Sequence, residues 1–180
     1  TLGPDQVELR GQLLATMATT FDAAYFPLMF TTARDQHAHA AVRETALVSL
    51  ARLANRAQAA QIRSLIAADP DNAARYDEYL LPYLLAAEQC DTDVTCYVGK
   101  LTDSDGKVAE KAARMLGLLA PDDHPAALAG LTQQLGHQVF DVRVAALLAL
   151  DHLAASGSPA AIDRIQQLSV MEDGRAIWQS

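Results

Sequence analysis

The sequence lacks most of the features by which an enzyme or a membrane protein is recognised at sight. Aromatic residues make up 6% of its 180 residues, and two residues are cysteines. Its longest apolar runs, such as LLPYLLAA from Leu80, are far shorter than the roughly 20 residues of a membrane-spanning helix. G-x-S-x-G, phosphate-loop and dinucleotide-binding motifs are also missing. We therefore predict a protein that is not an enzyme, needs no cofactor and has no membrane span.

The chain also lacks clustered positive charge. It contains 22 acidic and 14 basic residues, for a net charge of -8. Surfaces that bind nucleic acid or anionic membranes need gathered lysines and arginines. No run of Lys or Arg occurs here, so we predict no nucleic-acid partner.

Helix-forming residues dominate what is present, since alanine and leucine together make up about a third of the chain. Three segments align without gaps: VRETALVSLARL from Val42, VAEKAARMLGLL from Val108 and VRVAALLALDHL from Val142. Each reads V-x-x-x-A-x-x-x-L-x-x-L, which places the apolar residues on one face of a helix. The copies are offset by 66 and 34 residues, nearly multiples of one period. Such a period is typical of a helical solenoid.

An apolar helix pattern precedes each good copy, so each repeat is predicted to be an antiparallel helix pair. We predict a single domain over residues 1–180 with about five such pairs. The second helices of the repeats are expected near 42–54, 72–88, 106–120 and 139–155, with an incomplete repeat over 159–180.

The run of Asp141, Val142, Arg143, Ala146 and Leu150 resembles the HEAT and HEAT-like (armadillo-type) repeat family. This resemblance implies an all-α fold in which the helix pairs form a right-handed α–α superhelix. Members of the family are mainly protein-binding scaffolds, and a minority are enzymes. The resemblance also implies that the arginine after the repeat's valine, Arg43 or Arg143, bonds to an acid of a neighbouring repeat, with contact to a ligand as the alternative. It further implies that the second helices line a concave binding face.

Two features depart from the repeat. Pro82 falls inside the predicted helix at 72–88 and should kink or split it, because proline has no backbone N–H to donate. After residue 170 either a terminal stub caps the stack, with Trp178 packed against it, or the chain is a segment of a larger protein.

Several polar residues are predicted to begin helices. Ser158 is suited to the N-cap and Pro159 to the first helical position. The pair Asp122 and Asp123 is expected to open the helix that follows, where acids favour the dipole. Thr92 is the expected N-cap of the helix that carries the second cysteine.

Cys90 and Cys96 lie on either side of a short turn. That geometry suits a structural disulfide, although two reduced, partly buried thiols remain the alternative. Four zinc ligands are not gathered nearby, and the spacing is not C-x-x-C. A bridge, together with the absence of an initial methionine, favours an extracytoplasmic (periplasmic or secreted) location over a cytoplasmic one.

Candidate partner-binding residues lie at positions of the second helices that we expect to be exposed. These are Arg52, Lys111, Arg114, Leu148 and His152. Leu148 belongs here only if the apolar stripe is narrow, since a wide stripe would bury it. A second candidate set is Tyr76, Tyr79 and Tyr83, which share one helix face beside Pro82 and either serve an interface or fill a gap in the repeat.

The leading hypothesis is a non-enzymatic scaffold that binds a protein or peptide along its concave face. The alternative, by resemblance to lyase-associated HEAT-like proteins, is the handling of a tetrapyrrole-type small molecule or cofactor. His37 and His39 form H-x-H in a turn near acidic residues, but turn histidines usually bind no metal, so no metal site is predicted. The oligomeric state stays open.

Overall fold

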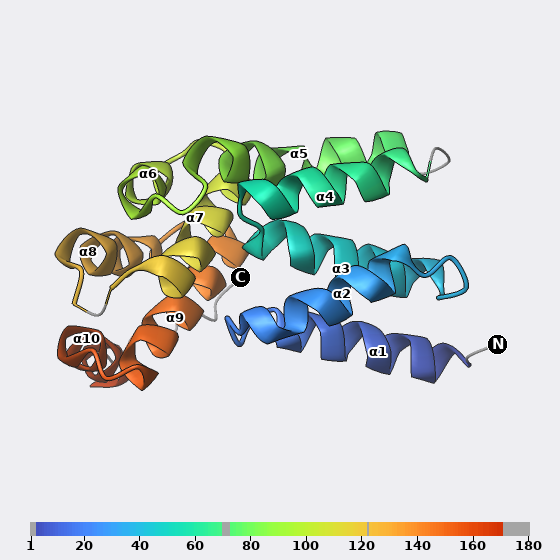
Figure 1. The fold of residues 1–180 in the computed structure, drawn as a ribbon. Helices are drawn as coiled ribbons and strands as arrows, with labels where there is room; N and C mark the ends of the chain where they lie inside the picture. Colours follow the sequence, from blue (N-terminus) through green and yellow to red (C-terminus); the bar gives the residue numbers. More distant parts are fainter. Residues whose placement is uncertain (1–2, 70–72, 122, 171–180) are drawn as a thin grey trace. The chain divides into compact units, whose positions relative to one another are not determined.

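The computed structural model describes residues 3–69, 73–121 and 123–170, and this part of the chain is all-helical, without a β-strand. The helices are α1 (Pro4–Met17), α2 (Phe26–Arg34, preceded by the 3₁₀ turn η1, Ala23–Tyr25), α3 (Ala40–Leu53), α4 (Arg56–Ala67), α5 (Ala73–Cys90), α6 (Val94–Lys100), α7 (Gly106–Leu119), α8 (Pro125–Gln134), α9 (Phe140–Ala155) and α10 (Pro159–Val170) (Figure 1). In the described ranges no helix is long and apolar enough to cross a bilayer.

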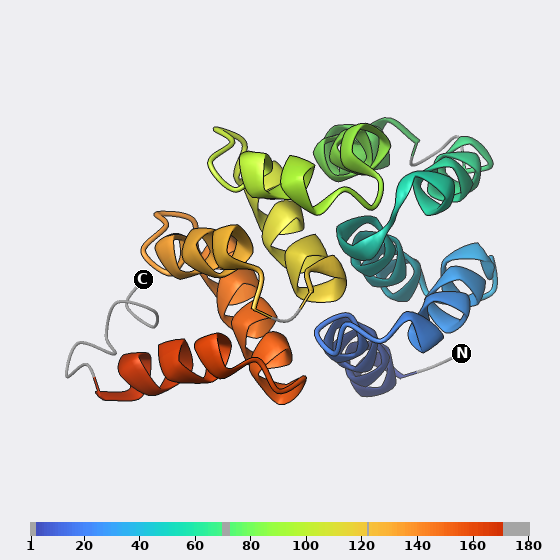
Figure 2. The same cartoon turned by 60° about the vertical axis from the view of Figure 1, so that its left-hand side comes forward.

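The chain divides into two compact units, residues 1–89 and 90–180. In the described part of the first unit, α1, α3 and α5 form one row of helices and α2 and α4 form a second row (Figure 2). Its core takes residues from all five helices, among them Leu14, Met29, Leu50, Ile62 and Leu84. Each of the five helices thus contributes apolar side chains to one shared core.

The sequence explains where these helices begin. Pro27 occupies the first turn of α2, where a missing N–H costs nothing. His39 caps α3 by accepting a hydrogen bond from the N–H of Ala41 at its Nδ1 atom, 3.3 Å away. Asn55 and Gln58 form a reciprocal capping box at the start of α4.

Helix α5 runs through Pro82 without a break, so of the two outcomes predicted for this proline, a kink or a split, the split does not occur. The carbonyl that loses its helical donor belongs to Glu78, an exposed residue. Further along, Glu88 anchors α5 to α4: its Oε1 accepts from Nε of Arg63 at 2.6 Å, and its backbone oxygen accepts from Nε of Arg56 at 2.9 Å.

In the second unit α9 is the central helix, since α7, α8 and α10 all pack against it, while α6 packs against α7. Alanines at the α7 and α9 contact, such as Ala112 and Ala146, are fully buried. Small side chains let these helices approach closely, as the repeat pattern predicted. Gly130 of α8 serves the same purpose, because a Cβ atom there would overlap the side chain of Leu101.

An arginine in each unit holds the turn before its helix. Nη1 of Arg43 donates to the carbonyl of Ala38 at 2.6 Å, and Nη1 of Arg143 donates to those of His137 and Gln138 at 2.9 and 3.1 Å. Among the described residues neither arginine pairs with a carboxylate, so the expected ladder of arginines and acids is not formed here. The two positions nevertheless match across 100 residues of sequence, as expected for repeats.

Caps in the second unit differ partly from the prediction. Asp93, rather than Thr92, caps α6, because its Oδ1 accepts from the N–H groups of Thr95 and Cys96. The N-cap of α8 is His124. Asp123 instead accepts from the hydroxyl of Ser158 at 2.7 Å, at the start of α10.

Most other helix positions agree with the prediction. Ser158 caps α10 as expected, with the N–H of Ala161 bonded to its Oγ at 3.2 Å. The four predicted second helices correspond to α3, α5, α7 and α9, each within a few residues at its ends. Asp122 and Trp178 lie outside the described residues.

Candidate functional site

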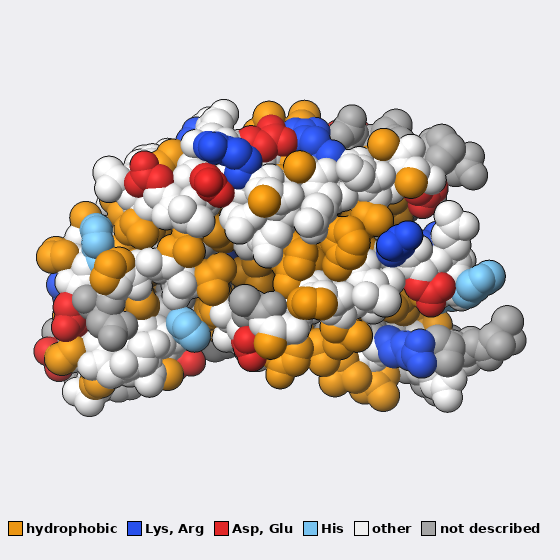
Figure 3. All heavy atoms as spheres, in the orientation of Figure 1, with side chains coloured by type: hydrophobic (Ala, Val, Ile, Leu, Met, Phe, Trp, Pro, Cys, Tyr) orange, Lys and Arg blue, Asp and Glu red, His pale blue; other side chains and the backbone are white. Residues whose placement is uncertain are grey.

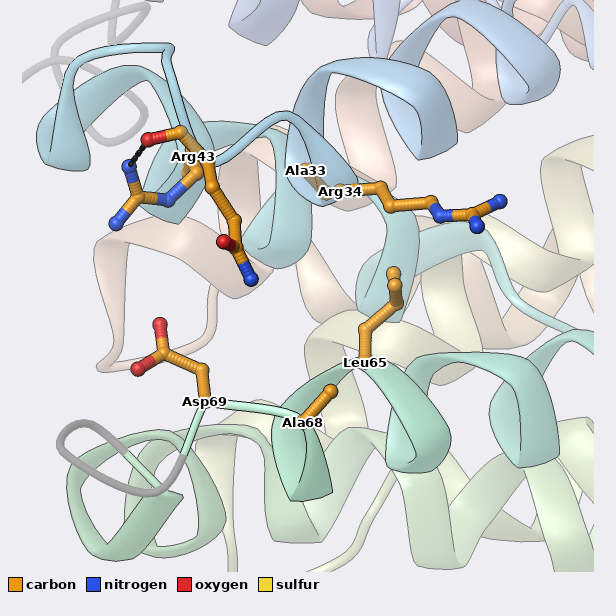
Figure 4. Close-up of a pocket in the computed structure, with 7 residues that line it drawn as sticks. Ala33, Arg34, Arg43, Leu65, Ala68 and Asp69 are labelled. Carbon is orange, nitrogen blue, oxygen red and sulfur yellow. Dashed lines mark hydrogen bonds between the residues drawn. The ribbon is translucent and has the colours of Figure 1, made fainter.

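A cavity of about 630 Å³ opens in the first unit. It lies where the ends of α2 and α4 meet the start of α3, and Figure 4 shows its walls. It is lined by Ala33, Arg34, Gln36, Arg43, Leu65, Ala68 and Asp69. Consecutive helices in this unit run antiparallel, so the C-terminal ends of α2 and α4 lie at the same end of the stack, and the loop before α3 closes the space between them.

One side of the cavity is polar. The guanidinium of Arg43 is held in place by its bonds to the carbonyls of Gln36 and Ala38. The side chain of Asp69 projects from the end of α4 into the same space (Figure 4). A cation and an anion therefore line one wall, and the side chain of Gln36 adds an amide that can both donate and accept.

The other side is apolar. Leu65 points from α4 into the cavity, and Ala33 and Ala68 complete the wall (Figure 4). Arg34 extends along this side and away from Arg43. A ligand that combines hydrogen-bonding groups with an aliphatic part fits such a lining, and the volume lies within the roughly 300–1,000 Å³ of small-ligand pockets.

The three predicted tyrosines have different environments. Tyr76 and Tyr83 are buried in the core of the first unit, and Tyr79 is 42% exposed. The rings of Tyr79 and Tyr83 are 6.5 Å apart and tilted. Tyr76 and Tyr83 therefore serve the core, and of the three tyrosines only Tyr79 presents a substantial surface.

The prediction that Lys111 and Arg114 are exposed is wrong. Both are buried on α7, with 0% and 5% of their surface accessible. Glu110, also buried, accepts from Nε of Arg114 at 2.9 Å. Burial lowers the pKa of Lys111 from 10.5 to about 7, and the negative charge of Glu110 opposes this shift. These two cations cannot serve as surface contacts in this structure.

The remaining predicted contact residues are partly accessible. Three of them, Arg52, Leu148 and His152, are half-buried. Leu148 is therefore partly covered, as it would be if the apolar face of the helix were wide. Arg52 ends α3 in the first unit, whereas Leu148 and His152 lie on α9 in the second. The cavity in Figure 4 contains none of these three residues.

The two cysteines are joined, as one of the two alternatives predicted. Cys90 ends α5 and Cys96 lies on α6, and the disulfide holds their Cα atoms 5.3 Å apart. Beside it, the hydroxyl of buried Tyr97 donates to the carbonyl of Asp91 at 3.0 Å. Burial, and secondarily the charge of Asp91, raise the pKa of Tyr97. The bridge and this bond both fasten the turn between α5 and α6.

His37 and His39 act within their own turn. His39 caps α3, and the N–H of His37 donates to Asp35. Within the described ranges no three His, Cys, Asp or Glu side chains come together in a way that could hold a metal ion.

The cavity itself was not predicted from the sequence. Its residues belong to three segments whose ends meet only after the helices stack, and none of them forms a motif. The available signal was indirect: the segment from the end of α2 to the first turn of α3 carries Arg34, Gln36 and Arg43, although a simple turn requires none of them.

Comparison with known proteins adds no family to these observations. No protein-family model matches the chain, and no curated protein matches it either. The fold and its cavities thus define the chain as an all-helical protein with an open, mixed-polarity site in its first unit.

Proposed function

We propose that this chain is a non-enzymatic helical-repeat scaffold, of the HEAT-like solenoid type, that binds a peptide segment of a partner protein. The observation that carries the proposal is the open cavity at the ends of α2 and α4. A peptide offers amide donors and acceptors at regular spacing together with apolar side chains. The amide groups of a peptide can bond to the polar side chains of Gln36, Asp69 and Arg43, and an apolar side chain can pack against Leu65.

The repeat supports the scaffold part of the proposal. Two rows of helices within the first unit, and the matching arginines at 43 and 143, are what repeated helix pairs would produce. Solenoids bind partners on surfaces that adjacent repeats build together. The cavity is likewise built by several helices together, α2, α3 and α4.

The cavity also differs from the site expected by resemblance. That expectation placed contacts on exposed positions of the second helices, two of which, Lys111 and Arg114, are buried. We therefore assign binding to helix ends and the loop before α3. Arg34 and Gln36 are exposed there and need no rearrangement to meet a ligand.

Selection from a displayed peptide library tests the proposal. Peptides enriched on the wild-type chain should bind Arg34→Glu and Ala68→Arg variants at least about tenfold more weakly, because the first reverses a charge and the second fills the cavity. Ala67→Arg is the matched control: Ala67 is equally exposed and adjacent, but does not line the cavity. No enriched peptide, or equal loss in the control, would contradict the proposal.

A second candidate is the handling of a tetrapyrrole-type small molecule, and the volume of the cavity favours it. A thermal-shift screen with tetrapyrroles, metal ions and nucleotides separates the two candidates, since a ligand present at 100 times its Kd stabilises the folded state by about 2.7 kcal/mol. A shift that Ala68→Arg abolishes would favour the small molecule. A flat screen together with enriched peptides would favour the scaffold.

A further inference from the structure

A second, more apolar groove lies between α1 and α2. It shares no lining residue with the cavity in Figure 4, although both use the segment that joins α2 to α3. Its volume is about 290 Å³. The lining is mostly aliphatic, with polar groups at the rim: Arg10, Leu13, Leu14, Met17, Leu28, Thr31, Thr32, Asp35, Ala38 and Val42. In the space-filling view, hydrophobic side chains gather over α1 and α2 (Figure 3).

Three exposed leucines belong to this surface: Leu13 and Leu28 line the groove, and Leu9 lies on α1 next to it in the helical register. Leu9, Leu13 and Leu28 are 57%, 50% and 48% exposed, the three most exposed large apolar side chains in the described part of the chain. Leu9 and Leu13 lie one helical turn apart on α1, so they share a face. Protruding aliphatic side chains and an aliphatic groove thus occur on the same two helices, and both remain in contact with water.

We propose that this groove, with Leu9, Leu13 and Leu28, is the interface through which two copies of the chain form a dimer. In a two-fold symmetric dimer, the same patch meets itself, so a patch must carry both the protrusion and the recess. The surface of α1 and α2 meets this requirement. Each copy would insert its leucines into the groove of the other.

The charges at the rim agree with this pairing. Arg10 lies on α1 and Asp35 follows α2, so they stand on opposite walls of the groove. Within one copy no ion pair joins these two described residues. In a dimer whose two-fold axis runs along the groove, α1 of each copy faces α2 of the other copy. Arg10 of each copy then meets the partner's Asp35.

The dimer does not depend on the proposed peptide site, and its test is separate. Light scattering after size exclusion should give twice the chain mass of 19.3 kDa at near-millimolar concentration, with dissociation on dilution. Leu13→Glu and Leu28→Glu should each weaken the dimer at least about a hundredfold, because a buried charge would face an apolar wall. Leu85→Glu, at a leucine 41% exposed on α5, is the matched control and should leave the dimer unchanged.

A charge exchange tests the pairing itself. Arg10→Glu and Asp35→Arg should each weaken the dimer about tenfold, and the two changes combined should restore most of the loss. Asp35→Asn keeps the bond that the N–H of His37 donates to residue 35 and should lose only the charge effect. A monomer at every concentration, a dimer indifferent to Leu13→Glu, or no restoration in the double variant would overturn the proposal.

Discussion

Replacing Lys111 by methionine should stabilise this protein, although it removes a charged residue that has an acidic neighbour. The side chain of Lys111 is fully buried, and burial holds its pKa at about 7 against an ordinary value of 10.5. Folding therefore has to move an ammonium group out of water or remove its proton. Methionine has a similar length and requires neither.

The expected gain in stability can be calculated from the difference between the pKa of Lys111 in the folded and unfolded states. One pKa unit corresponds to about 1.4 kcal/mol, so the depression from 10.5 to about 7 corresponds to a cost of about 5 kcal/mol when the amine is protonated in both states. The cost is about 4 kcal/mol at pH 7 and about 2 kcal/mol at pH 9. Glu110 keeps Arg114 as a partner at 2.9 Å in the variant, so its charge stays compensated.

The stability of the folded state should rise with pH, because the pKa of a basic group is lowered by folding. Below pH 7 both states bind the proton and the full cost is present. Between pH 7 and 10.5 the unfolded chain still binds the proton and the folded chain does not, so stability rises with pH. Tyr97 acts in the opposite direction only above pH 10, because its raised pKa means that only the unfolded phenol ionises there.

Urea unfolding followed by far-ultraviolet circular dichroism at several values between pH 7 and 9 measures this effect. The variant should exceed the wild type by up to about 4 kcal/mol at pH 7, and the difference should shrink as the pH rises. Lys107→Met, at a partly accessible lysine on the same helix, should change stability by less than about 1 kcal/mol. A less stable Lys111→Met variant, or a difference that is constant with pH, would show that burial of this amine carries no such cost.

Three further predictions concern the turns. Replacing both Cys90 and Cys96 by serine should cost about 2 kcal/mol, because the loop they close spans six positions; a reductant should lower the melting temperature of the wild type and leave the variant unchanged. His124→Ala should lose about 1 kcal/mol in urea unfolding and His124→Asn should lose little, since asparagine can still accept the cap bond. Arg143→Met should cost about 1–3 kcal/mol in the same assay by releasing the turn before α9, and an unchanged midpoint would contradict the role assigned to this arginine.

The helices could be predicted because their signals are local. The V-x-x-x-A-x-x-x-L pattern recurs at Val42, Val108 and Val142, and all three segments are helical with the valine of α3 and α9 and the alanines of all three buried. The spacing of Cys90 and Cys96 was also informative, because a turn of that length limits the distance between their Cα atoms.

Proline and capping arguments were less successful. Pro82 leaves α5 unbroken, and the residue whose carbonyl it deprives of a donor, Glu78, is exposed. The N-cap of α6 is Asp93 and not the neighbouring Thr92 that was predicted. Neighbouring capping residues differ little in intrinsic preference, and the path of the chain decides between them.

The candidate site could not be predicted for a different reason. Helix periodicity shows which residues share a face, but it does not show which faces are covered by other helices. Lys111 and Arg114 lie away from the V-A-L stripe and are nevertheless buried. The cavity of Arg34, Leu65 and Asp69 arises where separate helix ends meet, and its residues are far apart in the sequence.

Backbone amide chemical shifts recorded during titration with an enriched peptide show directly whether this cavity binds the peptide. The largest shifts should fall on residues that line the cavity, namely Ala33, Arg34, Gln36, Leu65, Ala68 and Asp69. Ala68→Arg should remove these shifts, and Ala67→Arg should not. Shifts that concentrate on other helices, or that persist in the Ala68→Arg variant, would contradict the assignment of this cavity as the binding site.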